Sequence, residues 1–70
     1  MSAIIVFKST HDAIKAKRTL DKARIDYEIL PTPKEISADC GISLRVAAPL
    51  LDRALVLLRA AEVRYRDDLL

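Results

Sequence analysis

The spacing of apolar residues changes along this chain in an order that leaves few folds open. Residues 3–7 are continuously apolar and rich in β-branched side chains, which is typical of a strand buried on both faces. Residues 25–30, 42–46 and 63–66 alternate between apolar and polar side chains and predict three further strands. Stretches with apolar residues three and four positions apart separate these strands and predict two helices. The expected order is therefore β-α-β-β-α-β.

Both helical stretches carry signals at their starts. Ser9 or Thr10 can cap the first helix, and Asp12 then lies in its first turn. The apolar stripe of this helix is mostly alanine, so we expect it to pack close to the layer beneath it; the stripe consists of Ala13, Ala16, Leu20 and Ala23. Pro49 suits the first turn of the second helix, where a missing N–H does no harm. The apolar face of that helix is broad and consists of Leu50, Leu51, Ala54, Leu55, Leu57, Leu58 and Ala61.

This order predicts an α+β, ferredoxin-like βαββαβ sandwich, in which a four-stranded antiparallel sheet carries two helices on one face. Residues 1–70 are expected to form a single domain, with residues 67–70 as its tail. Right-handed crossovers place the first and third strands in the middle of the sheet. The first and second strands then run parallel and end at the same edge. We therefore expect residues 8–11, residues 31–41 and the turn at 61–62 to be neighbours.

Composition limits the classes of partner. A chain of 70 residues has a thin core, and one cysteine allows no intrachain disulfide, so a homodimer is one way to add stability. The net charge of +2 and the three aromatic residues do not suit a nucleic-acid partner, and the basic residues between 15 and 24 are interpreted as a solvated helix face. No apolar run is long enough for a signal peptide or a membrane span. An unpaired cysteine suits a reducing compartment, so we expect a cytoplasmic protein.

Residues 31–41 concentrate the unusual residues of the chain. They contain its only cysteine, Cys40, its only glycine, Gly41, and two of its three prolines, Pro31 and Pro33. A connection of this length exceeds what a hairpin needs, and extra ordered length in a loop is often functional. The prolines are expected to stiffen the loop, and the glycine is expected to let the backbone turn and to leave space beside the sulfur. We therefore expect Cys40 to stand open to solvent as the reactive group.

The thiol would act as a thiolate, which nearby cations favour. The candidate cations are Lys34 in the loop itself and Lys8 and His11 in the neighbouring segment, whereas the carboxylate of Asp39 would disfavour the thiolate. A single thiol has no resolving partner and therefore suits a carrier better than a turnover enzyme. One cysteine and one histidine cannot make a closed zinc site, and no metal or other cofactor is expected. The alternative interpretation of Cys40 is a buried, inert filler at the start of a strand.

Three segments carry a further signal. They are Phe7-Lys8-Ser9-Thr10 followed by Ala13 and Ala16, residues 30–37 (LPTPKEIS), and residues 40–45 (CGISLR). With these segments, residues 5–46 of the chain resemble the small selenium/sulfur carrier protein-like family, formerly a domain of unknown function. The resemblance implies that Cys40 holds sulfur or selenium as a persulfide-type adduct and that Pro31, Pro33, Ser37 and Gly41 shape the loop around it. The chain departs from the family pattern at Lys34, where arginine is common.

Two functions of different class remain after this reasoning. The first is a sulfur or selenium carrier or relay, whose partners are donor and acceptor proteins that load and unload Cys40. The second is a non-catalytic ferredoxin-like module that binds a protein or a small ligand through its sheet or helices. RNA binding on the open face of the sheet is a poor third, because charged rather than aromatic side chains occupy the outer strand positions. The reactivity of Cys40 toward an alkylating agent at different pH values distinguishes the first two, because a buried filler would react slowly at every pH.

Overall fold

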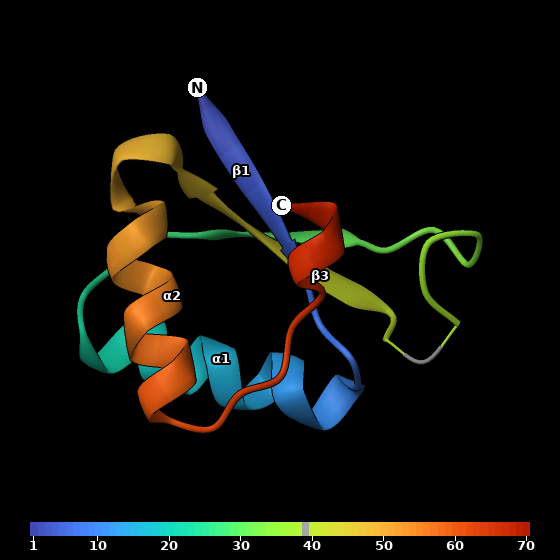
Figure 1. The fold of residues 1–70 in the computed structure, drawn as a ribbon, viewed down its shortest axis with the longest axis horizontal. Coiled ribbons are helices and arrows are strands. Elements are labelled where there is room, and N and C mark those ends of the chain that lie inside the picture. Colours follow the sequence, from blue (N-terminus) through green and yellow to red (C-terminus); the bar gives the residue numbers. More distant parts are fainter. Residues whose placement is uncertain (39) are drawn as a thin grey trace.

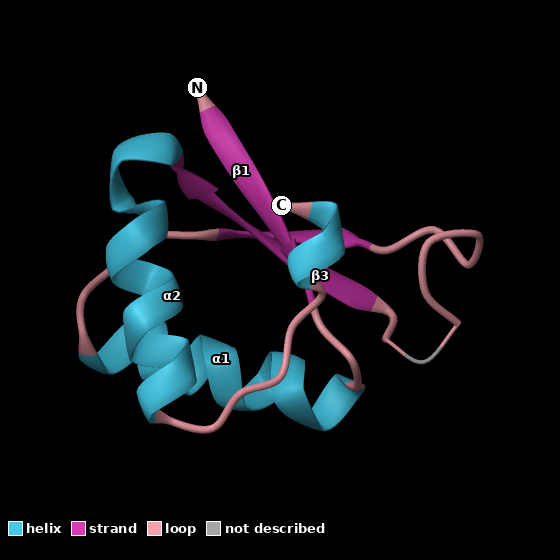
Figure 2. Ribbon diagram, in the orientation of Figure 1, coloured by secondary structure: helices cyan, strands magenta, loops and turns pink. Residues whose placement is uncertain are grey.

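A computed structural model describes residues 1–38 and 40–70, and these form two helices, two short 3-10 helices and three strands (Figures 1 and 2). Asp39, the carboxylate expected to disfavour the thiolate, lies outside the described residues. In chain order the elements are β1 (Ser2–Val6), α1 (Thr10–Lys22), β2 (Glu28–Pro31), β3 (Ile42–Ala47), η1 (Ala48–Leu50), α2 (Leu51–Ala60) and η2 (Asp67–Leu69).

The sheet has the order β1-β3-β2, and β3 pairs antiparallel with both neighbours. Within it, Leu44 of β3 lies opposite Ile5 of β1. Ser43, at the start of β3, lies opposite Val6 at the end of β1 and opposite Leu30 near the end of β2. The prediction that the first and second strands run parallel and end at one edge of the sheet is therefore confirmed.

α1 begins and ends with identifiable signals. Ser9 is its N-cap, as expected, and its hydroxyl accepts a hydrogen bond from the backbone N–H of Asp12 at 3.1 Å. At the other end Arg24 has a left-handed φ of 57°, and the N–H of Ile25 donates to the carbonyl of Leu20 at 3.0 Å. This bond closes the helix in a Schellman-type turn. Because Ile25 is used to close α1, β2 begins later than the alternating pattern predicted.

The prediction of a fourth strand at residues 63–66 is wrong, because among the described residues this segment makes a single bridge, between Tyr65 and Phe7, and no ladder. The segment is shortened at both ends. Glu62, just after α2, has a left-handed φ of 61°. The N–H of Val63 then donates to the carbonyl of Leu58 in that helix. The η2 helix then begins directly after the segment. The chain thus has an α+β fold with a three-stranded antiparallel sheet and two helices, and the ferredoxin-like topology stays a prediction.

Both helices lie on the same side of the sheet (Figure 1). The side chains that meet them include Ile5 of β1, Leu44 of β3 and Phe7 directly after β1, all fully buried. Close approach of the helices depends on small side chains, as the alanine stripe predicted. The fully buried residues of the two helices are Ala13, Ala16, Leu20, Ala54 and Leu58.

Replacing Ala16 with leucine tests this close packing. The side chain of Ala16 is fully buried, so three additional carbon atoms have to displace α1 or its neighbours. We expect the free energy of unfolding to fall by about 1–3 kcal/mol, measured by urea denaturation. The control is Ala60→Leu at an exposed position of α2, which is expected to change stability by less than about 0.5 kcal/mol. Equal effects of the two substitutions would contradict close packing at Ala16.

Candidate functional site

The loop between β2 and β3 has a closed base and a compact tip. At the base, the N–H of Thr32 donates to the carbonyl of Gly41 at 3.0 Å. At the tip, the carbonyl of Pro33 accepts from the N–H groups of Ile36 and Ser37, at 2.9 and 3.1 Å. These bonds hold residues 33–37 in a turn that projects from the sheet (Figure 1). Most side chains of residues 33–38 are exposed, so this tip projects from the protein and is not covered.

Cys40 is buried, with 1% of its surface exposed, and it belongs to the hydrophobic core. Its Sγ–H donates to the backbone carbonyl of Ile42 at 3.0 Å. The expectation that this thiol stands open to solvent is therefore wrong. The reason is the alternation of the strand, because Cys40 continues the positions of Ile42, Leu44 and Val46, which face the helices.

The three cations expected beside the thiol do not contact it through hydrogen bonds among the described residues. The side chains of Lys8, His11 and Lys34 are exposed, whereas the sulfur is buried. They do belong to segments that meet at one end of the sheet, as predicted. The N–H of Lys8 donates to the carbonyl of Arg64 at 3.3 Å, just beyond the end of α2. The structure thus brings the segments together but separates their charges from the sulfur.

Gly41 does not have the role that its conformational freedom suggested. Its φ is not positive, and a Cβ built on it would have no atom of the described, non-adjacent residues within 4 Å. The fold therefore does not require glycine at this position, and the expectation that it is needed for a turn is wrong. The expected open space is present, because Gly41 is exposed immediately next to the buried Cys40.

Two polar groups at the base of the loop were not anticipated as a pair. The hydroxyls of Thr32 and Ser43 are both buried and share a hydrogen bond. Ser43 alternates with the core positions of its strand, so it lies on the opposite face of the sheet. It is on that face, together with Val6, but both are covered. Burial on the outer face could not be predicted from the strand pattern, since it depends on segments distant in the sequence.

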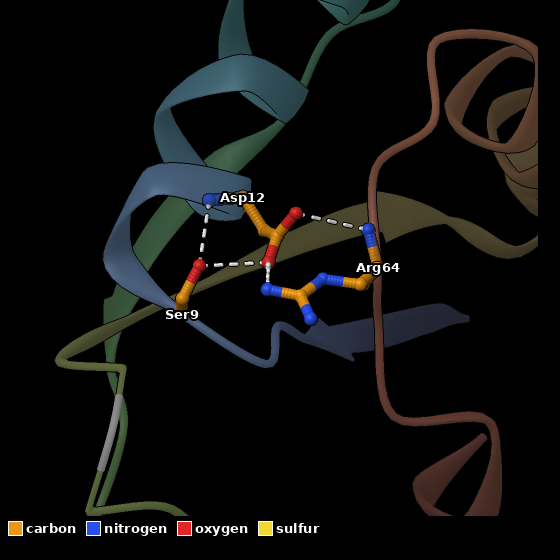
Figure 3. Close-up of polar contacts among 3 residues, drawn as sticks. All are labelled: Ser9, Asp12 and Arg64. Carbon is orange, nitrogen blue, oxygen red and sulfur yellow. Dashed lines mark hydrogen bonds and ion pairs between the residues drawn. The ribbon is translucent and has the colours of Figure 1, made fainter.

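Asp12 is the most buried carboxylate at this end of the molecule among the described residues, with 4% of its surface exposed. Figure 3 shows its side chain between Ser9, which precedes α1, and Arg64, which follows α2. One carboxylate oxygen accepts from the Ser9 hydroxyl at 2.7 Å and lies 3.3 Å from the Arg64 guanidinium. The other accepts from the backbone N–H of Arg64 at 3.1 Å. Asp12 therefore ties the start of α1 to the C-terminal segment.

The partners of Asp12 outweigh the effect of its burial. Burial alone would raise the pKa of the Asp12 carboxyl, but hydrogen bonds from Ser9 and Arg64 and the charge of Arg64 hold this pKa below its ordinary value of 3.8. The sequence signal for Asp12 was its place in the first helical turn. Its link to Arg64 had no sequence signal, because 52 positions separate the two residues.

The fold and the loop define a small α+β protein with one cysteine two residues before its central strand. The family model described as Putative Se/S carrier protein-like matches residues 2–67, and the chain belongs to this family. The match is longer than the stretch of residues 5–46 that carried the resemblance. Comparison with curated proteins and with solved structures gave no match. In the part of the chain that the structure describes, no helix combines the length and the apolarity needed to cross a bilayer.

Substituting Asp12 by asparagine tests the polar cluster. We expect the variant to lose about 1–2 kcal/mol of stability at neutral pH, because the amide cannot accept all the hydrogen bonds and carries no charge for Arg64. A carboxyl with a lowered pKa in the folded state stabilises above its ordinary pKa, and this contribution disappears as the pH falls through the folded value. The difference from wild type should therefore vanish in acid.

The measurement is urea denaturation of both proteins from neutral pH to below pH 3.8. Asp52→Asn, at an exposed position in the first turn of α2, is the control and should show little change. A difference for Asp12→Asn that stays constant in acid would show that the charge of Asp12 does not contribute.

Proposed function

We propose that this protein is a sulfur or selenium carrier that holds a persulfide-type adduct on Cys40. Membership of the Se/S carrier protein-like family supports the proposal. So does the position of the thiol at the base of an ordered, projecting loop. The partners of such a carrier are a donor protein that supplies the atom and an acceptor that removes it. An unpaired cysteine is suited to the cytoplasm, which is reducing.

The observation that carries the proposal is the contrast between two adjacent residues. Cys40 is buried, while Gly41 is exposed, with open space where a side chain would be. The fold gives no reason for glycine here, whereas an approaching protein does, because glycine lets another backbone come close. A sheltered thiol beside an accessible backbone suits a carrier whose sulfur reacts only after a partner has docked.

The transfer requires the thiol to leave its present hydrogen bond. Its proton lies toward the carbonyl of Ile42, and the nucleophile is the thiolate that remains when a base removes this proton. The thiolate attacks the terminal sulfur of the donor's cysteine persulfide. A new S–S bond forms on Cys40, the donor's S–S bond breaks, and the donor cysteine leaves as a thiolate that takes up the proton. No external oxidant or reductant is consumed, and the reverse attack by an acceptor thiolate unloads the atom.

The surrounding residues have supporting parts in this proposal. Pro31 ends β2 and Pro33 starts the turn of the tip, and Ser37 donates its N–H within that turn. We assign these three residues to the shape of the loop. Lys34 and the exposed cations of residues 8–11 are at the same end of the sheet and are assigned to the partner complex, where they would favour the thiolate once the sulfur is exposed.

One observation favours the alternative, a non-catalytic interaction module. A cysteine that is 1% exposed and bonded to a carbonyl is also what an inert core residue looks like. In that case Cys40 contributes packing alone and the exposed loop tip binds a partner by itself. Loading of the thiol with sulfur separates the two functions.

Incubation with a cysteine desulfurase and cysteine should load the protein with sulfur on Cys40. The measurement is the intact mass, which should rise by one sulfur atom and return to its original value with a thiol reductant. The matched control is Cys40→Ser, whose hydroxyl can keep the bond to Ile42 but cannot hold the adduct. A parallel arm with selenocysteine tests selenium. An unloaded wild-type protein, or equal loading of Cys40→Ser, would favour the interaction module.

Gly41→Ala should separate docking from folding. The added methyl group meets nothing within 4 Å and the φ is not left-handed, so stability should be unchanged or higher by up to about 1 kcal/mol. Loading by the desulfurase should nevertheless slow by roughly tenfold or more, because a displaced partner loses its alignment with the sulfur. Ala47→Ser, at the exposed far end of β3, is the control. If Gly41→Ala loads sulfur at the wild-type rate, the open space beside Cys40 is not used for docking of the donor.

A further inference from the structure

The outer edge of β1 is covered along only part of its length. At its end the N–H of Lys8 donates to the carbonyl of Arg64 at 3.3 Å. The N–H of Arg66 donates to the carbonyl of Val6 at 2.7 Å. The carbonyl of Arg66 then accepts from the N–H of Leu69 at 3.3 Å in η2, so the C-terminal segment leaves β1 at this point. The first half of β1 reaches beyond this contact (Figure 1) and has an open edge.

The same contacts define which backbone groups lie on the open edge. In an antiparallel ladder both backbone groups of a residue point to one side, and successive residues point to opposite sides. Val6 points to the C-terminal segment, so Ser2 and Ile4 point to this edge as well. Met1 points to β3, because its carbonyl accepts from the N–H of Ala48 at 3.0 Å. Among the described residues, no hydrogen bond reaches Ser2 or Ile4 from this edge, so their N–H and C=O groups are available to a further strand.

This half of β1 lacks the features that guard edge strands. Natural edge strands are usually protected by charges, by proline or by bulges. Residues 2–7 contain no charged side chain and no proline, and the side chain of Ile4 is 44% exposed. The other edge of the sheet is guarded, because β2 begins with the charge of Glu28 and ends with Pro31, which has no N–H. The edge of β1 is therefore the one that can accept a strand.

We propose that this edge pairs with the same edge of a second copy, which joins three strands from each copy into one continuous sheet. A two-fold axis beside Ala3 places Ser2 of each copy opposite Ile4 of the other. In this register every backbone group left open on Ser2 and Ile4 is bonded across the axis. A second copy is the occupant that fits, because the segment is complementary to itself. It brings no like charges together, and the small side chain of Ala3 lies where the strands meet.

This dimer leaves the candidate site uncovered. Ser2 lies opposite Ala47 at the end of β3, whereas residues 31–41 precede the start of β3. Because the two copies of β1 run in opposite directions, the two loops lie at opposite ends of the joined sheet. Each Cys40 is then approached independently of the other. The inference goes beyond the proposed function and does not depend on it.

Sedimentation velocity of the full-length chain over a series of concentrations tests the dimer. Wild type should change from monomer to dimer as its concentration rises toward about 1 mM, because an edge contact is a small interface. Ile4→Lys adds a charge to each copy beside the axis. Ser2→Pro removes two hydrogen bonds per dimer that the monomer does not use. Each variant should weaken association by roughly tenfold or more.

Two matched controls place the same charge on other exposed apolar positions. They are Val56→Lys on α2, where the side chain is 60% exposed, and Ile29→Lys on β2, where it is 50% exposed. Both should dimerise as wild type does. Urea denaturation of all variants shows that each is folded. Amide hydrogen exchange reports the register, since protection of the Ile4 N–H should rise with concentration far more than that of Ile5, which points to β3.

A wild-type chain that stays monomeric over this range overturns the proposal. So does a dimer that Ile29→Lys or Val56→Lys dissociates and Ile4→Lys does not. Sulfur loading of Cys40 is a separate measurement. A monomer that loads sulfur retains the proposed function without the dimer, and a dimer that does not load sulfur retains the interface without the carrier function.

Discussion

The structure depends on the pairing of β3 with β1 in one register. Side chains alternate across a strand, so placing Leu44 opposite Ile5 decides for every neighbouring residue of β3 which layer it enters. Ile42 and Val46 then face the helices together with Leu44, and Ser43 faces the other way. A slip of one position would exchange the two faces. The same alternation, continued past the start of the strand, places Cys40 in the core.

Much of the fold follows from the sequence because its elements have strong local signals. The helix cap at Ser9, the alanine stripe of α1 and the continuous apolar run of β1 all depend on neighbouring residues, and each corresponds to an element of the structure. The error at residues 63–66 has a different origin. Their alternating pattern is real, since Val63 and Tyr65 are buried, but whether a ladder forms depends on partners elsewhere. The backbone N–H of Arg64 in this segment donates to the side chain of Asp12 and not to a neighbouring strand.

The location of the candidate site could be predicted from the sequence, but the state of its thiol could not. Two prolines, a cysteine and a glycine within one loop indicated the segment that does project from the sheet. Exposure of Cys40 was inferred from its neighbours in the chain, whereas its burial follows from counting back by twos from Leu44. The hydrogen bond between Arg66 and Ile36 could not be predicted from the sequence either. Arg66 is 30 positions from Ile36, and no local pattern indicates an arginine that holds a distant carbonyl.

The two helices end in the same way, and this has a consequence for the whole chain. Each is followed by a left-handed residue, Arg24 or Glu62, and then by a buried apolar residue that bonds back to the helix. Each helix therefore stops at a turn of its own, and the residue that closes the turn also fixes the following segment to the core. Both left-handed positions carry a side chain in place of glycine, so each helix end has a local backbone cost that the burial of Ile25 and Val63 helps to offset.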